Sequence, residues 1–255
     1  MRGLVTNVRV LLGAIAVFAA SASAPVHATP WFEIDAGDLT TTAETTVGTR
    51  PLDVISGHLD FDLDTSLWDI DLFQIRVDDP ATFSARTVLG DPSVFVSDPV
   101  LFLFGFGGLG IYMNDDISVS PPLLEAGLPA GHASGPTTRG LYYLGVAWGF
   151  SDPQSLLGSI FPVYEQSLPT DGVYGPTGTG GGGPLASWLP GGPINFDTGS
   201  DYRIVLTGVF AAVPEPGALL LLATAGFAAL VRRRKAPSST ATGNAPLDSK
   251  ATATC

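Results

Sequence analysis

The stretch WDIDLFQIRV, residues 68–77, indicates the fold class because its side chains follow a period of two. Successive side chains of a strand point to opposite faces of a sheet. One face therefore carries Trp68, Ile70, Leu72, Gln74 and Arg76, and the other carries Asp69, Asp71, Phe73, Ile75 and Val77. Each face changes in polarity along the stretch, so the alternation is imperfect, but the pattern predicts a strand.

The same pattern recurs on both sides of this stretch, between frequent glycines and prolines. In DYRIVLTGV, residues 201–209, Tyr202, Ile204 and Leu206 share one face. Short apolar segments separated by turn residues are typical of antiparallel sandwiches. The strands predicted in this way are 53–61, 69–77, 82–88, 100–105, 108–113, 140–148 and 202–210. We therefore expect an all-β fold, an antiparallel β-sandwich over residues 29–171.

Residues 172–199 interrupt the pattern and include four consecutive glycines, Gly180–Gly183. This composition predicts a long flexible Gly/Pro-rich loop, after which residues 200–212 return as a final strand. The glycines do not form a phosphate-binding loop, because no Gly-Lys-Ser/Thr follows them.

Three segments of the middle region follow one another in a specific order. They are DIDLFQIRVDDPATFSART (69–87), DPVLFLFGFGGLGIYMNDDI (98–117) and GLYYLGVAWGFSDP (140–153). Together they resemble the bacterial pre-peptidase C-terminal domain over residues 54–150. The resemblance implies a jelly-roll-like β-sandwich with a non-catalytic accessory role, in a group of domains of which some bind calcium or extracellular polymers.

The body of the chain is strongly acidic and has no cysteine. Residues 29–213 hold 22 Asp and Glu against five Arg and no Lys. Such a surface repels phosphate backbones, which argues against a nucleic-acid partner. The single cysteine, Cys255, cannot form an intrachain disulfide.

Residues 1–28 have the pattern of a secretory signal peptide. Arg2 and Arg9 supply positive charge, and the apolar run Val10–Ala20 has 11 residues, too few to span a bilayer. Small residues precede a predicted signal-peptidase cleavage after Ala28. Cleavage after Ala24 and an uncleaved anchor helix are the alternatives.

The C-terminal segment VPEPGALLLLATAGFAALVRRRK, residues 213–235, has three parts in order. The stiff tripeptide Pro214, Glu215, Pro216 comes first, and an uncharged apolar run over 217–231 predicts a transmembrane helix. The cluster Arg232, Arg233, Arg234 then predicts a cytoplasmic end. This order resembles the PEP-CTERM sorting signal of Gram-negative bacteria. An ordinary tail anchor is the alternative, and residues 236–255 are predicted to be disordered.

The PEP-CTERM resemblance implies an exported protein held in the inner membrane, facing the periplasm, until an exosortase cleaves it near the tripeptide. The product would then reach the cell surface or the medium. The resemblance also implies a link to exopolysaccharide and biofilm, with extracellular polysaccharide as a candidate partner.

Two groups of acidic residues are candidates for calcium, the one cofactor that the sequence suggests. Alternating aspartates of a strand share a face, and a hard cation would relieve their repulsion. The alternative interpretation is that the aspartates form a solvated acidic face and that residues 114–116 form a structural turn. The candidate ligands are Asp60, Asp62, Asp64, Asp69, Asp71, Asn114, Asp115 and Asp116.

The sequence favours a protein that is not an enzyme. No Gly-x-Ser-x-Gly or His-Glu-x-x-His motif occurs, and the body has no cysteine nucleophile. Tyr142, Tyr143 and Trp148 are interpreted as core positions in preference to a sugar-stacking face. The competing hypothesis is a secreted hydrolase with a pair of carboxyl groups, for which a cleft holding buried acids with shifted pKa values would be the evidence.

Overall fold

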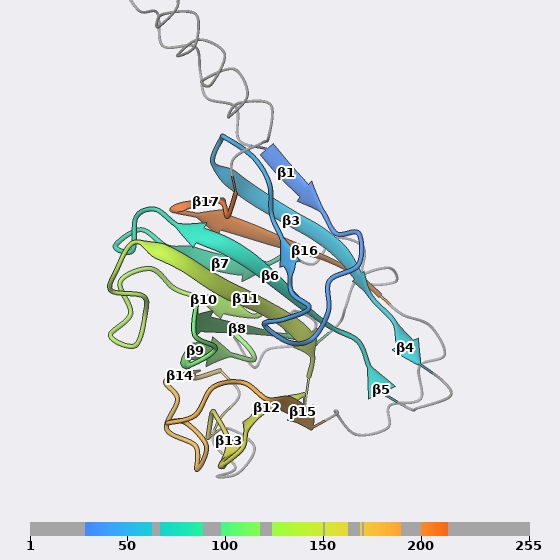
Figure 1. Cartoon of the computed structure of the whole chain (residues 1–255), viewed down its shortest axis with the longest axis vertical. Helices are drawn as coiled ribbons and strands as arrows, with labels where there is room; N and C mark the ends of the chain where they lie inside the picture. Colours follow the sequence, from blue (N-terminus) through green and yellow to red (C-terminus); the bar gives the residue numbers. More distant parts are fainter. Residues whose placement is uncertain are drawn as a thin grey trace, which may run out of the picture.

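A computed structural model describes residues 29–62, 67–88, 98–117, 124–149, 151–162, 169, 171–189 and 200–213. Every regular element of these residues is a strand, which confirms the predicted all-β class (Figure 1). The strands are β1 (Thr29–Phe32), β2 (Glu44–Thr45), β3 (Leu52–Leu59), β4 (Phe61–Asp62), β5 (Leu67–Trp68), β6 (Ile70–Val77), β7 (Ser84–Thr87), β8 (Pro99–Gly105), β9 (Gly110–Asn114), β10 (Gly127–Leu128), β11 (Gly140–Trp148), β12 (Asp152–Ser155), β13 (Gly158–Ser159), β14 (Val173–Tyr174), β15 (Ser187–Leu189), β16 (Ser200–Thr207) and β17 (Val209–Ala211).

Two predicted helices fall outside these ranges, the signal helix within 1–28 and the transmembrane helix at 217–231. Within the ranges that the structure describes, no helix is long and apolar enough to cross a membrane.

Each predicted strand has a counterpart, and the prediction for 140–148 has the same bounds as β11. The predicted strand 202–210 is divided at Gly208, whose φ of 73° is in the left-handed region that favours glycine. An added Cβ there would lie 2.8 Å from the carbonyl oxygen of Asp79. The bend carries the chain from β16 in one sheet to β17 in another.

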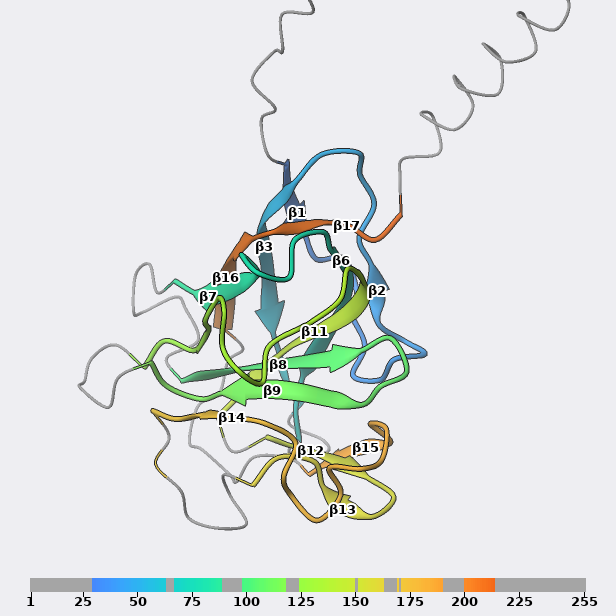
Figure 2. The same ribbon diagram turned by 90° about the vertical axis from the view of Figure 1, so that its left-hand side faces the viewer.

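The strands form two main sheets that share one apolar core, as expected for a sandwich. The first has the order β1-β3-β16-β7-β10, and the second has the order β14-β9-β8-β11-β6-β17, with β2 beside β6. All pairs are antiparallel except β1 with β3 and β2 with β6. The core between the sheets includes Ile55 and Ile204 from the first and Phe73, Leu103 and Leu144 from the second. Figure 2 shows the sheets as separate layers.

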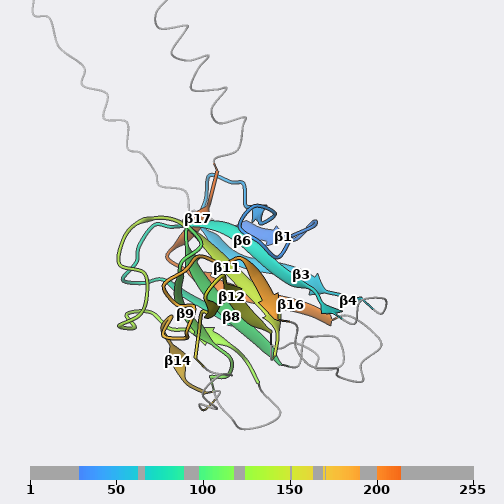
Figure 3. The same ribbon diagram turned by 60° about the horizontal axis from the view of Figure 1, so that its bottom comes forward.

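The outer face of the second sheet is also buried, because a small third sheet of order β13-β12-β15 covers it. Phe102 of β8 contacts the rings of Phe161 and Trp188, with centroid distances of 5.8 and 5.2 Å. Figure 3 brings this end of the molecule forward. The cover explains the imperfect alternation of residues 68–77: Ile70 and Leu72 pack under the third layer, while Gln74 on the same face is only half-buried.

In the described part of the predicted flexible loop, residues 172–189, β14 pairs with β9 of the second sheet and β15 pairs with β12 of the third sheet. The glycines of this part form tight turns: the amide of Gly180 donates to the carbonyl of Ser159 at 2.7 Å, and that of Gly183 to Gly180 at 2.9 Å. The amide of Leu185 then donates to Gly108 of the β8–β9 turn at 2.9 Å. The predicted loop therefore contains hydrogen-bonded turns and the short strands β14 and β15, and its flexibility stays a prediction. Residues 190–199 lie outside the described ranges.

Candidate functional site

The C-terminal end of the fold is held by one buried threonine. Thr46 follows β2 and is fully buried. Its hydroxyl donates to the carbonyl of Gln74 at 2.8 Å and accepts from the amide of Ala212 at 2.9 Å. The amide of Val213 donates to the carbonyl of Thr46 at 3.1 Å, and the amide of Gly48 donates to the carbonyl of Val213 at 2.8 Å. The chain is therefore hydrogen-bonded to the fold up to Val213.

Both ends of the described body lie at the same pole. Pro30 of β1 and Ala211 of β17 line one small recess. Figure 1 shows β1 and β17 together at the end opposite β13. The described residues next to the predicted signal peptide and next to the predicted sorting signal therefore lie at the same pole. Ala28, Pro214, Glu215, Pro216, Arg232, Arg233 and Arg234 themselves lie outside the described residues.

A second feature, called here the acidic pocket, has a volume of about 680 Å³. Its carboxyl groups come from the segment after β1 and from the β3–β6 region: Glu33, Asp35, Asp38, Asp60 and Asp69. Trp68 and Trp188 add indole rings to the lining. The structure thus brings the predicted residues Asp60 and Asp69 together with three acids that the sequence analysis missed.

Several acids of this region are fixed by donors of the fold. Glu44 accepts from the Trp31 indole at 3.0 Å and from the amide of Ile34 at 3.0 Å. Glu33 accepts from the amide of His58 at 3.1 Å. These bonds hold the segment 33–38 as one wall of the pocket, a role that sequence spacing did not reveal.

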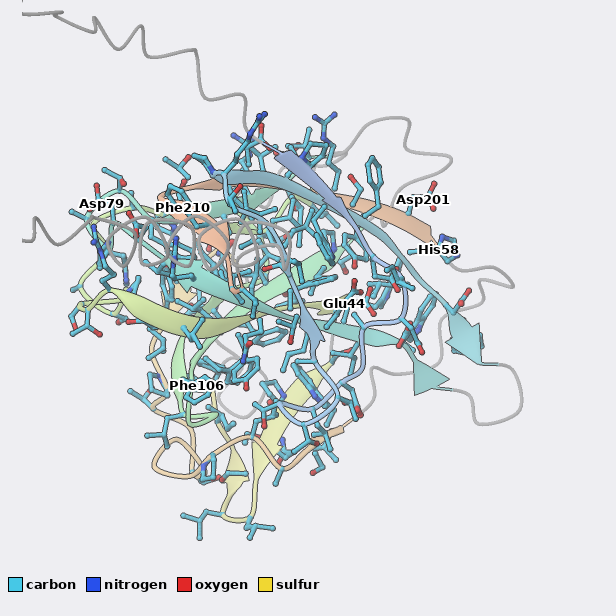
Figure 4. The ribbon with its side chains drawn as sticks, turned by 45° about the horizontal axis from the view of Figure 1, so that its top comes forward. Glu44, His58, Asp79, Phe106, Asp201 and Phe210 are labelled. Carbon is cyan, nitrogen blue, oxygen red and sulfur yellow. The ribbon has the colours of Figure 1, made fainter. Side chains whose placement is uncertain are left out.

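His58 lies at the rim of the acidic pocket between two carboxylates. Its Nδ1 is 2.7 Å from Oδ1 of Asp201, and its Nε2 is 3.3 Å from Oδ1 of Asp60. The pairing of β3 with β16 places Asp201 opposite His58. Figure 4 shows His58 and Asp201 side by side. The pocket can accept a polar or cationic ligand, since its lining supplies many hydrogen-bond acceptors.

Asp71 has a different environment from its neighbours and does not face the acidic pocket. It is fully buried, and the Tyr202 hydroxyl donates to its Oδ2 at 2.6 Å. Burial raises the pKa of Asp71 to about 9, and repulsion from Asp69 and Glu33 adds to the effect. Burial and nearby Glu33 and Asp60 also raise the pKa of Asp69. Asp71 is thus an uncharged core residue at neutral pH.

The second predicted calcium group forms a structural junction. Asn114 at the end of β9 donates to the carbonyls of Asp116 at 2.6 Å and Gly172 at 2.9 Å, and its Oδ1 accepts from Gly127 at 2.7 Å. Asp115 and Asp116 are buried next to it. Burial, followed by the charge of Asp116, raises the pKa of nearby Asp98 to about 6.

Among the described residues, no group of three or more His, Cys, Asp or Glu side chains is arranged to hold a metal ion. Asp71 and Asn114 have the structural contacts given above, and Asp64 and the side chain of Asp62 lie outside what the structure describes. Calcium therefore stays a prediction from the sequence, with no geometric support from the described ligands.

Comparison with known protein families finds a match at the C-terminal end of the chain. Residues 212–235 match the model of the PEP-CTERM protein-sorting motif. The motif marks an exported protein that an exosortase sorts, and it implies a precursor anchored in the membrane. No curated protein and no solved structure matches the chain. The matched residues lie outside 54–150, so the resemblance to the pre-peptidase C-terminal domain stays a prediction.

Proposed function

We propose that this chain is an exosortase-sorted protein of the cell surface or extracellular matrix, with a non-catalytic β-sandwich body that has a structural or binding role linked to exopolysaccharide or biofilm. The observation that carries the proposal is the meeting of motif and fold: the sorting motif begins at residue 212, and the last described residue, Val213, is hydrogen-bonded to the body. An accessory module that binds calcium or carbohydrate is a narrower form of the same proposal.

The geometry supports export of the body, anchoring by its C-terminal segment and then cleavage by an exosortase. Because Thr46 and Gly48 hold Ala212 and Val213, the Pro214–Pro216 tripeptide follows the body without a spacer. Both ends of the body lie at one pole. After export directed by the signal peptide, the body can therefore remain anchored in the membrane by its C-terminal segment. An exosortase that cleaves near the tripeptide would release the whole folded body.

Substitution of the tripeptide tests the proposal in the producing cell. The double variant Pro214→Ala with Glu215→Ala is expected to accumulate in the membrane fraction at the precursor mass, while the wild-type chain is shortened. The control is Pro246→Ala with Asp248→Ala, which changes a proline and an acid outside the motif. The control is expected to be processed like the wild type, and equal processing of all three chains would contradict the proposal. Immunoblots of fractionated cells give the readout.

A second candidate function is a hydrolase that cleaves a glycosidic bond with two carboxyl groups. The observation that favours it is the acidic pocket, where Asp69 has a raised pKa beside Glu33 and Asp60. Release of reducing ends from a polysaccharide, abolished by Asp69→Asn, would establish this function in place of the non-catalytic one.

A further inference from the structure

A hollow of about 800 Å³ lies beside the β8–β9 turn, and its described lining contains no charged side chain. We call it the neutral groove. Its walls are the turn after β8, the loop 133–138 and the start of β11. The body has 22 acidic residues between 29 and 213, so this hollow differs in charge from the body as a whole. Uncharged walls neither attract a cation nor repel an anion, so they suit a ligand without charge.

Phe106 gives the neutral groove an exposed aromatic side chain. It lies in the β8–β9 turn and is 59% exposed. Its ring is nearly parallel to that of Tyr143, with an interplanar angle of 7° and a centroid distance of 6.0 Å. The turn is closed by bonds from the amide of Gly105 to Leu109 and from that of Gly108 to Gly105, both 2.8 Å. The ring is therefore held in place without being buried.

The loop 133–138 supplies hydroxyl groups to the lining of the neutral groove and is braced by hydrogen bonds. Thr137 and Thr138 are exposed, and Ser134 is half-buried. The Tyr142 hydroxyl donates to the carbonyl of Thr138 at 2.7 Å, and the amide of Ser134 donates to Nδ1 of His132 at 3.2 Å. The His132 ring in turn stacks on Tyr112 with a centroid distance of 6.0 Å. Hydroxyls on a braced loop can exchange hydrogen bonds with a ligand at small entropic cost.

We propose that the neutral groove binds a chain of uncharged pyranose sugars, with one sugar ring on Phe106. The C–H groups of a pyranose face carry slight positive charge and are attracted to the negative face of an aromatic ring. The sugar hydroxyls match the hydroxyls of the loop 133–138. A cationic sugar chain would instead be drawn to the acidic pocket, on a different part of the molecule. The inference rests on the proposed function in one respect: the protein must be exported to a place where extracellular polysaccharide is present.

The test is calorimetric titration of the protein isolated from its producing cells with neutral probes: cellohexaose, laminarihexaose and maltohexaose. At least one is expected to bind, and Phe106→Ala is expected to weaken that binding tenfold or more. Phe106→Trp keeps an aromatic face and is expected to keep binding. The matched control is Phe32→Ala, because Phe32 is 68% exposed on β1 of the other sheet, and it is expected to leave binding unchanged.

Three outcomes would overturn the inference: no binding of any neutral probe, equal affinity of Phe106→Ala and wild type, or binding confined to a cationic chitosan hexamer. Processing of Phe106→Ala is followed in the same cells. If Phe106→Ala is processed normally but no longer binds the sugar, the result supports the neutral groove as the binding site. If the wild-type chain itself is not processed, the result counts against the sorting proposal and not against the neutral groove.

Discussion

The free energy of unfolding is expected to fall as the pH rises from about 6.5 to about 8.5, by about 1.4 kcal/mol for each pH unit. Asp71 is the cause. Its pKa is raised from 3.8 to about 9 by burial, so the folded protein keeps a proton that the unfolded chain releases. The stabilisation is complete below about pH 4 and is lost as the pH rises through about 9. Asp98, with a pKa of about 6, has the same sign but titrates mainly below this window.

Asp71→Asn tests this assignment because the amide is uncharged and can still accept from Tyr202. Urea denaturation at several pH values is expected to give a nearly flat profile for this variant. Asp79→Asn, on an exposed turn, is the control and is expected to keep the slope of the wild type. Equal slopes for Asp71→Asn and wild type would show that Asp71 is not the buried acid responsible.

Gly180→Ala is expected to loosen the third layer and cost about 2 to 3 kcal/mol of stability. A Cβ at this position would overlap the carbonyl oxygen of Gly158, which is backbone and cannot move aside without breaking the β12–β13 hairpin. Hydrogen exchange is expected to speed up at the amides of Leu185 and Ala186, which are bonded to Gly108 and Gln154, and to stay unchanged in β3 and β16.

Gly182→Ala is the matched control, two residues away in the same run. An added Cβ there has no atom within 4 Å, so the variant is expected to keep the stability and exchange rates of the wild type. Equal behaviour of the two alanine variants would contradict a packed role for the glycine run and would favour the flexible loop that its composition predicts.

The sequence predicted the strands well because their signal is local. The strand predicted for GLYYLGVAW matches β11 over its whole length, and the interpretation of Tyr142, Tyr143 and Trp148 as core residues is confirmed by their burial. Asp71 alternates with Phe73 and Ile75, so the pattern itself placed it on a buried face. The sequence analysis nevertheless named Asp71 a calcium candidate, because it follows Asp60, Asp62 and Asp64 closely in the sequence.

The third layer and the candidate sites were not predictable in this way, because their contacts join residues far apart in the chain. Gln154 pairs with Ser187, and Trp188 donates from its indole to the carbonyl of Asp38 at 2.7 Å. The hydroxyl of Thr46 is bonded to Ala212, which is 166 residues away. Hydrophobic alternation is a local signal and therefore does not indicate pairs that are this far apart in the chain.

The mass of the mature protein, recovered from the native host with and without its exosortase, tests the sorting function most directly. We expect a form that runs from near Thr29 to the vicinity of Pro214, and we expect this form to be absent when the exosortase is deleted. A form that retains Arg232 to Cys255 in both strains would contradict exosortase sorting and would leave an ordinary membrane anchor in its place.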